Sequence, residues 1–247
     1  MNITNKTILI TGGGSGIGFE IAKLLSQKGN KVIITGRTEV KLQNAASQLN
    51  NVSYIACDIN SEADINSLVN KITEEFGSLD ILINNAGQAS AYKLAAGVNA
   101  YTKAAAEIQT NYLSVIRLTE KLLPLLTGQK ETAIVNVTSI VAFVPGINLP
   151  TYAASKSALH SYSQALRYTL AKTTNIKVFE LMPPLVNTEF SAEIGGANGI
   201  APELVAEGLI EGFEKDEYEL HIGKTADIYK LFLSSPQEAM NTLNKDR

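Results

Sequence analysis

Two tyrosine–lysine pairs with the same spacing occur within one short segment, TYAASKSALHSYSQALRYTLAK. Tyr152 precedes Lys156 by four residues, and Tyr168 precedes Lys172 by four residues. Positions i and i+4 share one face of a helix, so either pair could bring an ammonium beside a phenol. A nearby positive charge favours the phenolate, which would let the tyrosine exchange a proton near neutral pH. Each pair is therefore a candidate acid–base catalyst.

Position along the predicted helix separates the two pairs. Tyr152 and Lys156 follow Pro150 at the start of the helix, which faces the carboxyl edge of the predicted sheet, where open α/β sheets bind ligands. Tyr168 comes sixteen residues later, about 24 Å along a helix. We therefore assign the catalytic role to Tyr152 and expect Lys156 and the helix N-terminus to lower its pKa. Tyr168 is interpreted as a packed or partner-facing aromatic.

A glycine-rich turn, ITGGGSGIG at residues 10–18, joins the first predicted strand to the first predicted helix. Glycines let the backbone approach a pyrophosphate, and the helix N-terminus supplies N–H donors and a favourable dipole. A simple flexible turn would also explain the glycines, but the strand–turn–helix context favours phosphate binding. The predicted contacts from this turn are Gly12, Ser15, Gly16, Ile17 and Gly18.

The glycine spacing resembles the TGxxxGxG pattern of the short-chain dehydrogenase/reductase family. Further motifs resemble that family in order and spacing, between about residue 6 and residue 190. They are NNAG at 84–87, Asn111 in QTNYLSVI, Ser139 in NVTS, YAASK at 152–156 and PPLVNTEF at 183–190. The resemblance implies a catalytic tetrad of Asn111, Ser139, Tyr152 and Lys156. In it, Ser139 would bond the substrate oxygen, and Asn111 would position a water that relays protons to Lys156.

The same resemblance implies cofactor contacts beyond the glycine-rich turn. Asp58 would contact the adenine, although it could also be an N-cap-like turn residue. Pro184 stands where the family usually has glycine, so the nicotinamide contact is expected from the backbone near Val186 and from the Thr188 hydroxyl. Lys156 would also hold the nicotinamide ribose hydroxyls. The implied set is Asp58, Ile59, Asn85, Ala86, Gly87, Tyr152, Lys156, Pro183, Val186 and Thr188.

The end of the second predicted strand bears on the choice of cofactor. An acidic residue there would receive the ribose 2′-OH of NAD, whereas an arginine would accept the 2′-phosphate of NADP. In TGRTE, Gly36 takes the place of the acid and Arg37 follows it. Arg37 could also be a solvated arginine, and Glu39 could be a displaced ribose acceptor. We expect NADP(H) to be preferred, with NAD(H) as the alternative.

Short apolar runs alternate with helical patterns along the chain. Strands are predicted at 6–11, 31–36, 51–56, 79–84, 132–138, 176–182 and 218–223, and helices at 17–28, 39–49, 62–76, 101–126, 152–173 and 202–213. This alternation predicts an α/β, Rossmann-like doubly wound parallel β-sheet of about seven strands with helices on both faces. We expect a single NAD(P)-binding domain over residues 1–247, with substrate loops at about 88–100, 140–150 and 187–201.

Composition argues against several kinds of partner. Charged residues make up 18% of the chain and the net charge is -3, so nucleic acid is not expected. The single cysteine, Cys57, excludes an internal disulfide and fits a reducing compartment. No targeting segment or membrane-length apolar run is visible, so we expect a cytoplasmic protein that does not bind membranes. His160 and His221 lack metal-ligand spacing, and no metal site is expected.

The C-terminal segment from residue 218 onward departs from the family's usual tetramer-forming end. A tetramer is therefore in doubt, and a homodimer through the helices at about 101–126 and 152–173 is expected. Within the family, this tail and MPPLVNTEF are most similar to the oxidoreductases that accompany teichoic-acid D-alanylation genes.

These features together predict an oxidoreductase that moves a hydride between NADP(H) and a small, uncharged alcohol or carbonyl, with Tyr152 as acid–base. Apolar loop residues such as Ile140 and Phe190 suggest an apolar pocket, although they could equally be core or lid packing. One alternative is a nucleotide-sensing binding protein without catalysis, which has no need of the intact tetrad. Another is a sugar epimerase or dehydratase of the same superfamily, which would carry a longer substrate region after the sixth strand.

Overall fold

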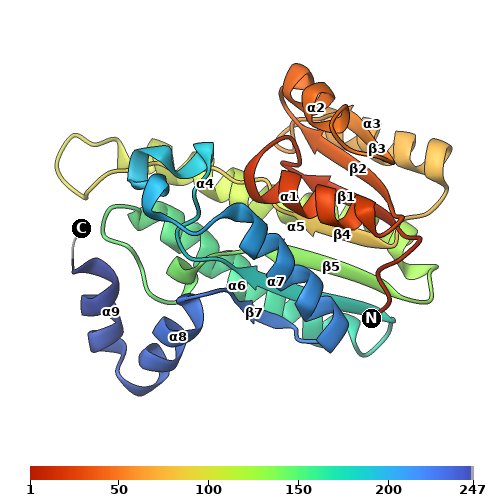
Figure 1. The fold of residues 1–247 in the computed structure, drawn as a ribbon. Helices are drawn as coiled ribbons and strands as arrows, with labels where there is room; N and C mark the ends of the chain where they lie inside the picture. Colours follow the sequence, from red (N-terminus) through yellow and green to blue (C-terminus); the bar gives the residue numbers. More distant parts are fainter. Residues whose placement is uncertain (246–247) are drawn as a thin grey trace.

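One parallel sheet of seven strands forms the centre of the molecule (Figure 1). The structure is a computed structural model that describes residues 1–245, so residues 246 and 247 of the predicted domain lie outside the described part. The strand order is β3-β2-β1-β4-β5-β6-β7. The strands are β1 (Thr7–Thr11), β2 (Lys31–Gly36), β3 (Val52–Ala56), β4 (Ile81–Asn84), β5 (Thr132–Val137), β6 (Ile176–Met182) and β7 (Glu219–His221). The predicted doubly wound fold is confirmed.

Helices cover both faces of this sheet. One core lies under α1 (Gly16–Gln27), α2 (Glu39–Ala46) and α7 (Pro202–Lys215), and the other under α3 (Glu62–Phe76), α5 (Ser114–Thr127) and α6 (Pro150–Leu170). Successive strand residues alternate between the two cores. In β1, Ile8 and Ile10 enter one core and Leu9 enters the other, all fully buried. This two-sided burial explains why the strands read as continuous apolar runs.

The centre of the sheet is the point where the chain changes the direction in which it adds strands. There β1 and β4 lie side by side, with β2 and β3 added on one flank and β5, β6 and β7 on the other. Loops that leave such neighbouring strands diverge, and a crevice opens at the carboxyl edge. The glycine-rich turn follows β1 and the NNAG turn follows β4, so the topology delivers both to this crevice.

The predicted helix 101–126 is interrupted in its middle. A π-helical turn, Gln109–Leu113, joins α4 (Ala100–Ile108) to α5. It carries Asn111, whose side chain is fully buried. Such turns insert a residue without stopping the helix and are frequent at functional sites. Elsewhere the predicted bounds differ by only a few residues: the helix predicted at 39–49 ends at Ala46, and the strand predicted at 79–84 begins at Ile81.

The C-terminal tail, for which the sequence predicts no helix, folds as α8 (Thr225–Ser234) and α9 (Pro236–Asn244) beyond β7 (Figure 1). Asn244 at the end of α9 accepts a hydrogen bond from the Ile147 N–H (2.9 Å) and donates one to the Pro145 carbonyl (3.0 Å). The tail therefore supports the predicted substrate loop 140–150. Within residues 1–245, no helix has both the length and the apolar character needed to cross a bilayer.

Packing of α7 on the sheet yields a test of the fold. Phe213 is fully buried and meets Phe179 of β6 edge-on, with ring centroids 4.9 Å apart. We expect Phe213→Ala to lower the free energy of unfolding by about 3–5 kcal/mol, because it leaves a cavity between α7 and the sheet. Urea unfolding followed by circular dichroism measures this. Leu204→Ala on the exposed side of the same helix is the control, and equal losses in both variants would contradict the packing described.

Candidate functional site

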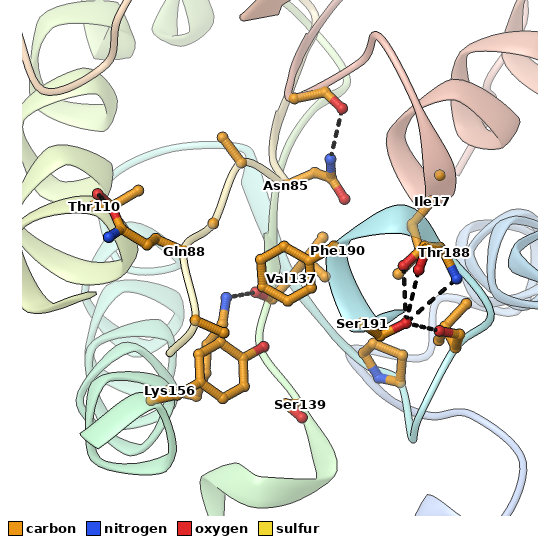
Figure 2. A pocket seen from close by; sticks show the side chains of 18 of the residues that line it. Ile17, Asn85, Gln88, Thr110, Val137, Ser139, Lys156, Thr188, Phe190 and Ser191 are labelled. Carbon is orange, nitrogen blue, oxygen red and sulfur yellow. Dashed lines mark hydrogen bonds between the residues drawn. The ribbon is translucent and has the colours of Figure 1, made fainter. Parts of the chain in front are cut away.

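A cleft opens at the carboxyl edge of the sheet, and nearly all of the predicted site residues line it (Figure 2). Only two of them, Gly18 and Asn111, lie outside the lining. Those in it are Gly12, Ser15, Gly16, Ile17, Arg37, Asp58, Ile59, Asn85, Ala86, Gly87, Ser139, Tyr152, Lys156, Pro183, Val186 and Thr188. Segments far apart in the sequence are thus brought to one crevice.

The glycine-rich turn is packed too tightly to admit side chains at its key positions. Gly16 adopts a φ of 55°, a conformation that L side chains rarely take. A Cβ on Gly18 would lie 2.4 Å from the Gly12 carbonyl oxygen and 2.5 Å from Asn85 Nδ2. Gly18 therefore acts from behind the turn, by letting α1 meet the NNAG segment. The α1 N-terminus is left facing the cleft, as a phosphate site requires.

Asn85 connects the turn after β4 to the glycine-rich turn after β1. Its Nδ2 donates to the Thr11 and Gly12 carbonyls at 2.9 and 3.2 Å. The Thr11 hydroxyl in turn accepts from the Asn85 and Ala86 N–H groups, both at 3.0 Å. These bonds tie the turn after β4 to the turn after β1, which keeps the floor of the cleft rigid.

The end of the cleft beside β2 and β3 holds Arg37 and Asp58. Asp58 Oδ1 accepts from the Asn60 N–H at 2.9 Å, so the turn-residue interpretation is confirmed, and Asp58 still lines the cleft. Glu39, the competing ribose acceptor, opens α2 and does not line the cleft. Arg37, directly after β2, is thus the positively charged side chain that lines this end of the cleft.

Lys156 and Tyr152 lie together at the opposite end, on the first turns of α6. Both are almost fully buried, at 4% and 8% exposed, and Ser139 is similarly buried after β5. The Lys156 Nζ donates to the Val137 carbonyl at 2.8 Å (Figure 2) and lies 5.6 Å from the centre of the Tyr152 ring. The competing Tyr168 is 70% exposed and lies outside the cleft. The structure therefore brings only the first tyrosine–lysine pair to the site.

The expected lowering of the Tyr152 pKa is wrong. Burial raises the pKa of Tyr152 well above its usual value, and hydrogen bonding to Ser139 offsets only part of the increase. Burial also lowers the pKa of Lys156 to about 8, opposed by the charge of Glu180. The physical reason is that both groups lie in a desolvated pocket, where each charged form is disfavoured. Tyr152 is accordingly a protonated phenol at neutral pH.

Asn111 holds the structure around Tyr152 and Lys156. Its Nδ2 donates to the Gln88 carbonyl and the Ser155 hydroxyl, both at 2.8 Å, and its Oδ1 accepts from the Gln88 N–H at 2.8 Å. Ser155 Oγ donates to the Tyr152 carbonyl at 2.7 Å. This chain of bonds links the π-helical turn to α6 at Tyr152. With every polar atom of the side chain bonded, Asn111 acts by positioning its neighbours.

Several residues of the site carry no sequence signal. Gln88 lines the cleft and accepts a hydrogen bond from the Thr110 hydroxyl at 3.3 Å (Figure 2). Ser155 is hidden within YAASK, and its role becomes visible only through the bond from Asn111. The sequence indicates these two side chains only by their neighbours: Gln88 directly follows NNAG, and Ser155 directly precedes Lys156.

The end of the cleft beside Tyr152 is apolar. The ring centroids of Phe190 and Tyr152 lie 6.1 Å apart. The segment that carries Phe190 also closes over the phosphate end, because Thr188 lies 3.0 Å from where a Gly16 Cβ would stand. Pro184 lines the cleft, and the backbone beyond it is held by a bridge between Val186 and Ile200. The remaining apolar lining here is Ala89, Ile140, Val141, Leu149, Leu185 and Ile194.

Residues 1–245 contain no group of three or more His, Cys, Asp or Glu side chains that could together bind a metal ion. His160 bonds Glu180, and His221 stacks on Tyr229 with ring centroids 4.3 Å apart.

The close approach at Gly18 yields a test of the cleft floor. We expect Gly18→Ala to lower the melting temperature by several degrees, because its Cβ would force the Gly12 carbonyl and Asn85 apart. Gly14→Ala is the matched control, since its Cβ would meet only Leu42 at 3.4 Å. Calorimetry measures both variants, and an undisturbed Gly18→Ala protein would contradict the tight contact.

Comparison with known proteins identifies the family. A family model described as short chain dehydrogenase matches residues 6–199. An uncharacterised oxidoreductase of Bacillus subtilis (strain 168), DltE, is 36% identical over 225 residues, which cover 89% of each chain. An uncharacterised oxidoreductase of Staphylococcus aureus (strain USA300) is 32% identical over 213 residues, which cover 84% of this chain and 90% of the relative. Both resemblances seen in the sequence are confirmed.

Solved structures show the same fold. A short chain dehydrogenase/reductase from Burkholderia phymatum in complex with NAD has a TM-score of 0.87 at 20% identity, covering 99% of this chain and 97% of that one. A short chain dehydrogenase from Burkholderia cenocepacia in complex with NADP has a TM-score of 0.87 at 22% identity, covering 98% and 99%. By the family match and the curated relatives, the chain belongs to the short-chain dehydrogenase/reductase family of NAD(P)-dependent oxidoreductases.

Proposed function

We propose that the protein is an NADP(H)-dependent carbonyl reductase or alcohol dehydrogenase acting on a small, uncharged, apolar substrate. The observation that carries the proposal is the convergence of Tyr152, Lys156 and Ser139 at one end of a cleft whose other end holds Arg37. The floor between them fits a dinucleotide, because the glycine turn leaves no room for side chains at Gly18.

The catalytic roles follow from burial and charge. The bound nicotinamide supplies or accepts the hydride. Tyr152, a protonated phenol, donates its proton to the substrate carbonyl oxygen, and Ser139 offers a second hydrogen bond to that oxygen. The Lys156 ammonium, held by Val137, stabilises the phenolate left after the proton has moved. The raised pKa of Tyr152 favours carbonyl reduction, because the acid form is the one present.

Substrate preference follows from the side chains around Tyr152. Ile140, Val141, Leu149 and Phe190 offer no charge and few hydrogen bonds. An apolar pocket with a few convergent polar groups suits an aldehyde, ketone or quinone without ionised groups.

We also propose that the protein works in the cytoplasm as a homodimer. Tyr101 and Tyr168, on α4 and α6, are 87% and 70% exposed, and Leu113 between α4 and α5 is 44% exposed. Exposed aromatic and aliphatic side chains on helices of this size favour a paired helical surface. The rival function is a nucleotide-sensing protein, which would bind NADPH but turn nothing over.

Removing the phenolic hydroxyl tests the proposed acid. We expect Tyr152→Phe to lower turnover by about 10²–10⁴-fold while NADPH affinity is retained, because positioned proton transfer contributes that much. NADPH oxidation against a panel of aldehydes, ketones and quinones measures it. Tyr168→Phe is the matched control. Turnover that survives the first change and is lost in the second would reverse the assignment, and a wild-type protein that binds NADPH and reduces nothing would favour the sensor.

Replacing Arg37 tests the cofactor. We expect Arg37→Ala to weaken NADPH binding by about 10–100-fold, the value of a charge-assisted hydrogen bond, and to leave NADH binding unchanged. Titration calorimetry with both cofactors measures this, and Glu39→Ala is the control on the same segment. Equal affinity for the two cofactors in the wild type, unaffected by Arg37→Ala, would defeat the assignment of NADP(H).

A further inference from the structure

A buried carboxylate lies beside the catalytic helix and takes no part in the mechanism above. Glu180, in β6, is 0% exposed. The Nδ1 of His160 lies 2.9 Å from each of its carboxylate oxygens, and the Thr138 hydroxyl donates to one of them at 2.6 Å. A buried ionised carboxylate is costly unless it is paired and hydrogen-bonded. Both oxygens of the Glu180 carboxylate are hydrogen-bonded, as a buried carboxylate requires.

Strand register places this carboxylate on β6, beside the strand whose carbonyl binds Lys156. His160 follows Lys156 by one helical turn on the same face of α6. Glu180 pairs with Asn136 of β5, one residue before Val137, whose carbonyl binds the Lys156 ammonium. Thr138, the next residue, lines the cleft and reaches back to Glu180. The imidazole therefore comes from the turn of α6 that follows Lys156, and the carboxylate that it bonds comes from β6, beside the strand that holds the ammonium.

The ammonium needs such support. Lys156 is 4% exposed, and its ammonium donates to the neutral Val137 carbonyl, which offers a dipole but no counter-charge. Burial lowers the pKa of Lys156, and the charge of Glu180 raises it. A lysine that lost its proton here would no longer stabilise a phenolate at Tyr152.

We propose that Glu180 is a positioning residue that supplies the buried counter-charge for Lys156, and that the protonation state of His160 sets how much of this charge Lys156 experiences. The role rests on the proposed function of Lys156. Protonated His160 neutralises the carboxylate, and Lys156 then holds its proton less firmly. Neutral His160 leaves the carboxylate unscreened, and Lys156 holds its proton more firmly.

The other charges near this cluster are few. Arg167 of α6 and Glu219 of β7 act on His160 in opposite directions, and His221 lies at the end of β7. Hydrogen bonding to Glu180 is the largest influence and raises the pKa of His160. Arg167 and Glu219 bond each other at 2.9 Å, so their charges largely cancel.

Titration of Lys156 itself tests the proposal without any substrate. The probe is the Lys156 side-chain ¹⁵Nζ and ¹³Cε signal in the full-length protein, assigned by its loss in Lys156→Ala. We expect Glu180→Gln to lower the pH at which Lys156 titrates by about one pH unit or more. We expect His160→Gln to raise it, because the carboxylate loses its screening cation. In Glu180→Gln/His160→Gln the second change should add nothing. Glu214→Gln, which removes an exposed carboxylate of α7 away from this cluster, is the control and should leave the Lys156 titration in place.

Opposite shifts in the two single variants are the signature, because loss of packing alone would not move one titration down and the other up. An unchanged Lys156 titration in folded Glu180→Gln would overturn the proposal. Should that variant fail to fold, His160→Gln decides alone, and the absence of an upward shift there overturns it. Because no turnover is measured, the result stands apart from the test of Tyr152 as the catalytic acid.

Discussion

The ammonium of Lys156 is held in a desolvated pocket by the carbonyl of Val137, and the rest of the site is arranged around that bond. The carbonyl comes from the end of β5, and the ammonium from the second turn of α6. Parallel pairing on both sides of β5 fixes the first, and Asn111, bonded to Ser155, fixes the second. A buried charge interacts more strongly with neighbouring charges and dipoles than the same charge in water. Small displacements of β5 or α6 would therefore change the electrostatic environment of Lys156 and Tyr152.

Desolvation also decides the chemical state of the tyrosine. In water, an ammonium one helical turn away would favour the phenolate. In the cleft, removal of water from the phenol outweighs that effect, and the pKa of Tyr152 rises. The acid form of Tyr152 is therefore the one present at neutral pH. The same loss of water explains why Lys156 requires charged support from behind.

The C-terminal tail packs against the segments that form the apolar end of the cleft. Helices α8 and α9 share a small core with the loop after β5 and with Tyr152, and Asn244 binds that loop at two backbone groups. The apolar side chains of the two tail helices therefore pack in the same core as the cleft-lining residues Ile140, Val141 and Leu149.

The sequence alone determined the strand–helix alternation, the glycine turn and the residue types of the site, because two-sided burial and tight turns leave strong local patterns. Position after Pro150 also sufficed to predict that Tyr152, and not Tyr168, lies in the cleft. Only the tertiary structure decided the π-helical turn at Asn111, the helices of the tail, the clamps formed by Asn85 and Asn244, and the raised pKa of Tyr152. These depend on desolvation and on contacts between residues far apart in the chain, such as Glu180 with His160 and Lys156 with Val137. The spacing of residues along the sequence does not predict how strongly tertiary packing desolvates a given side chain.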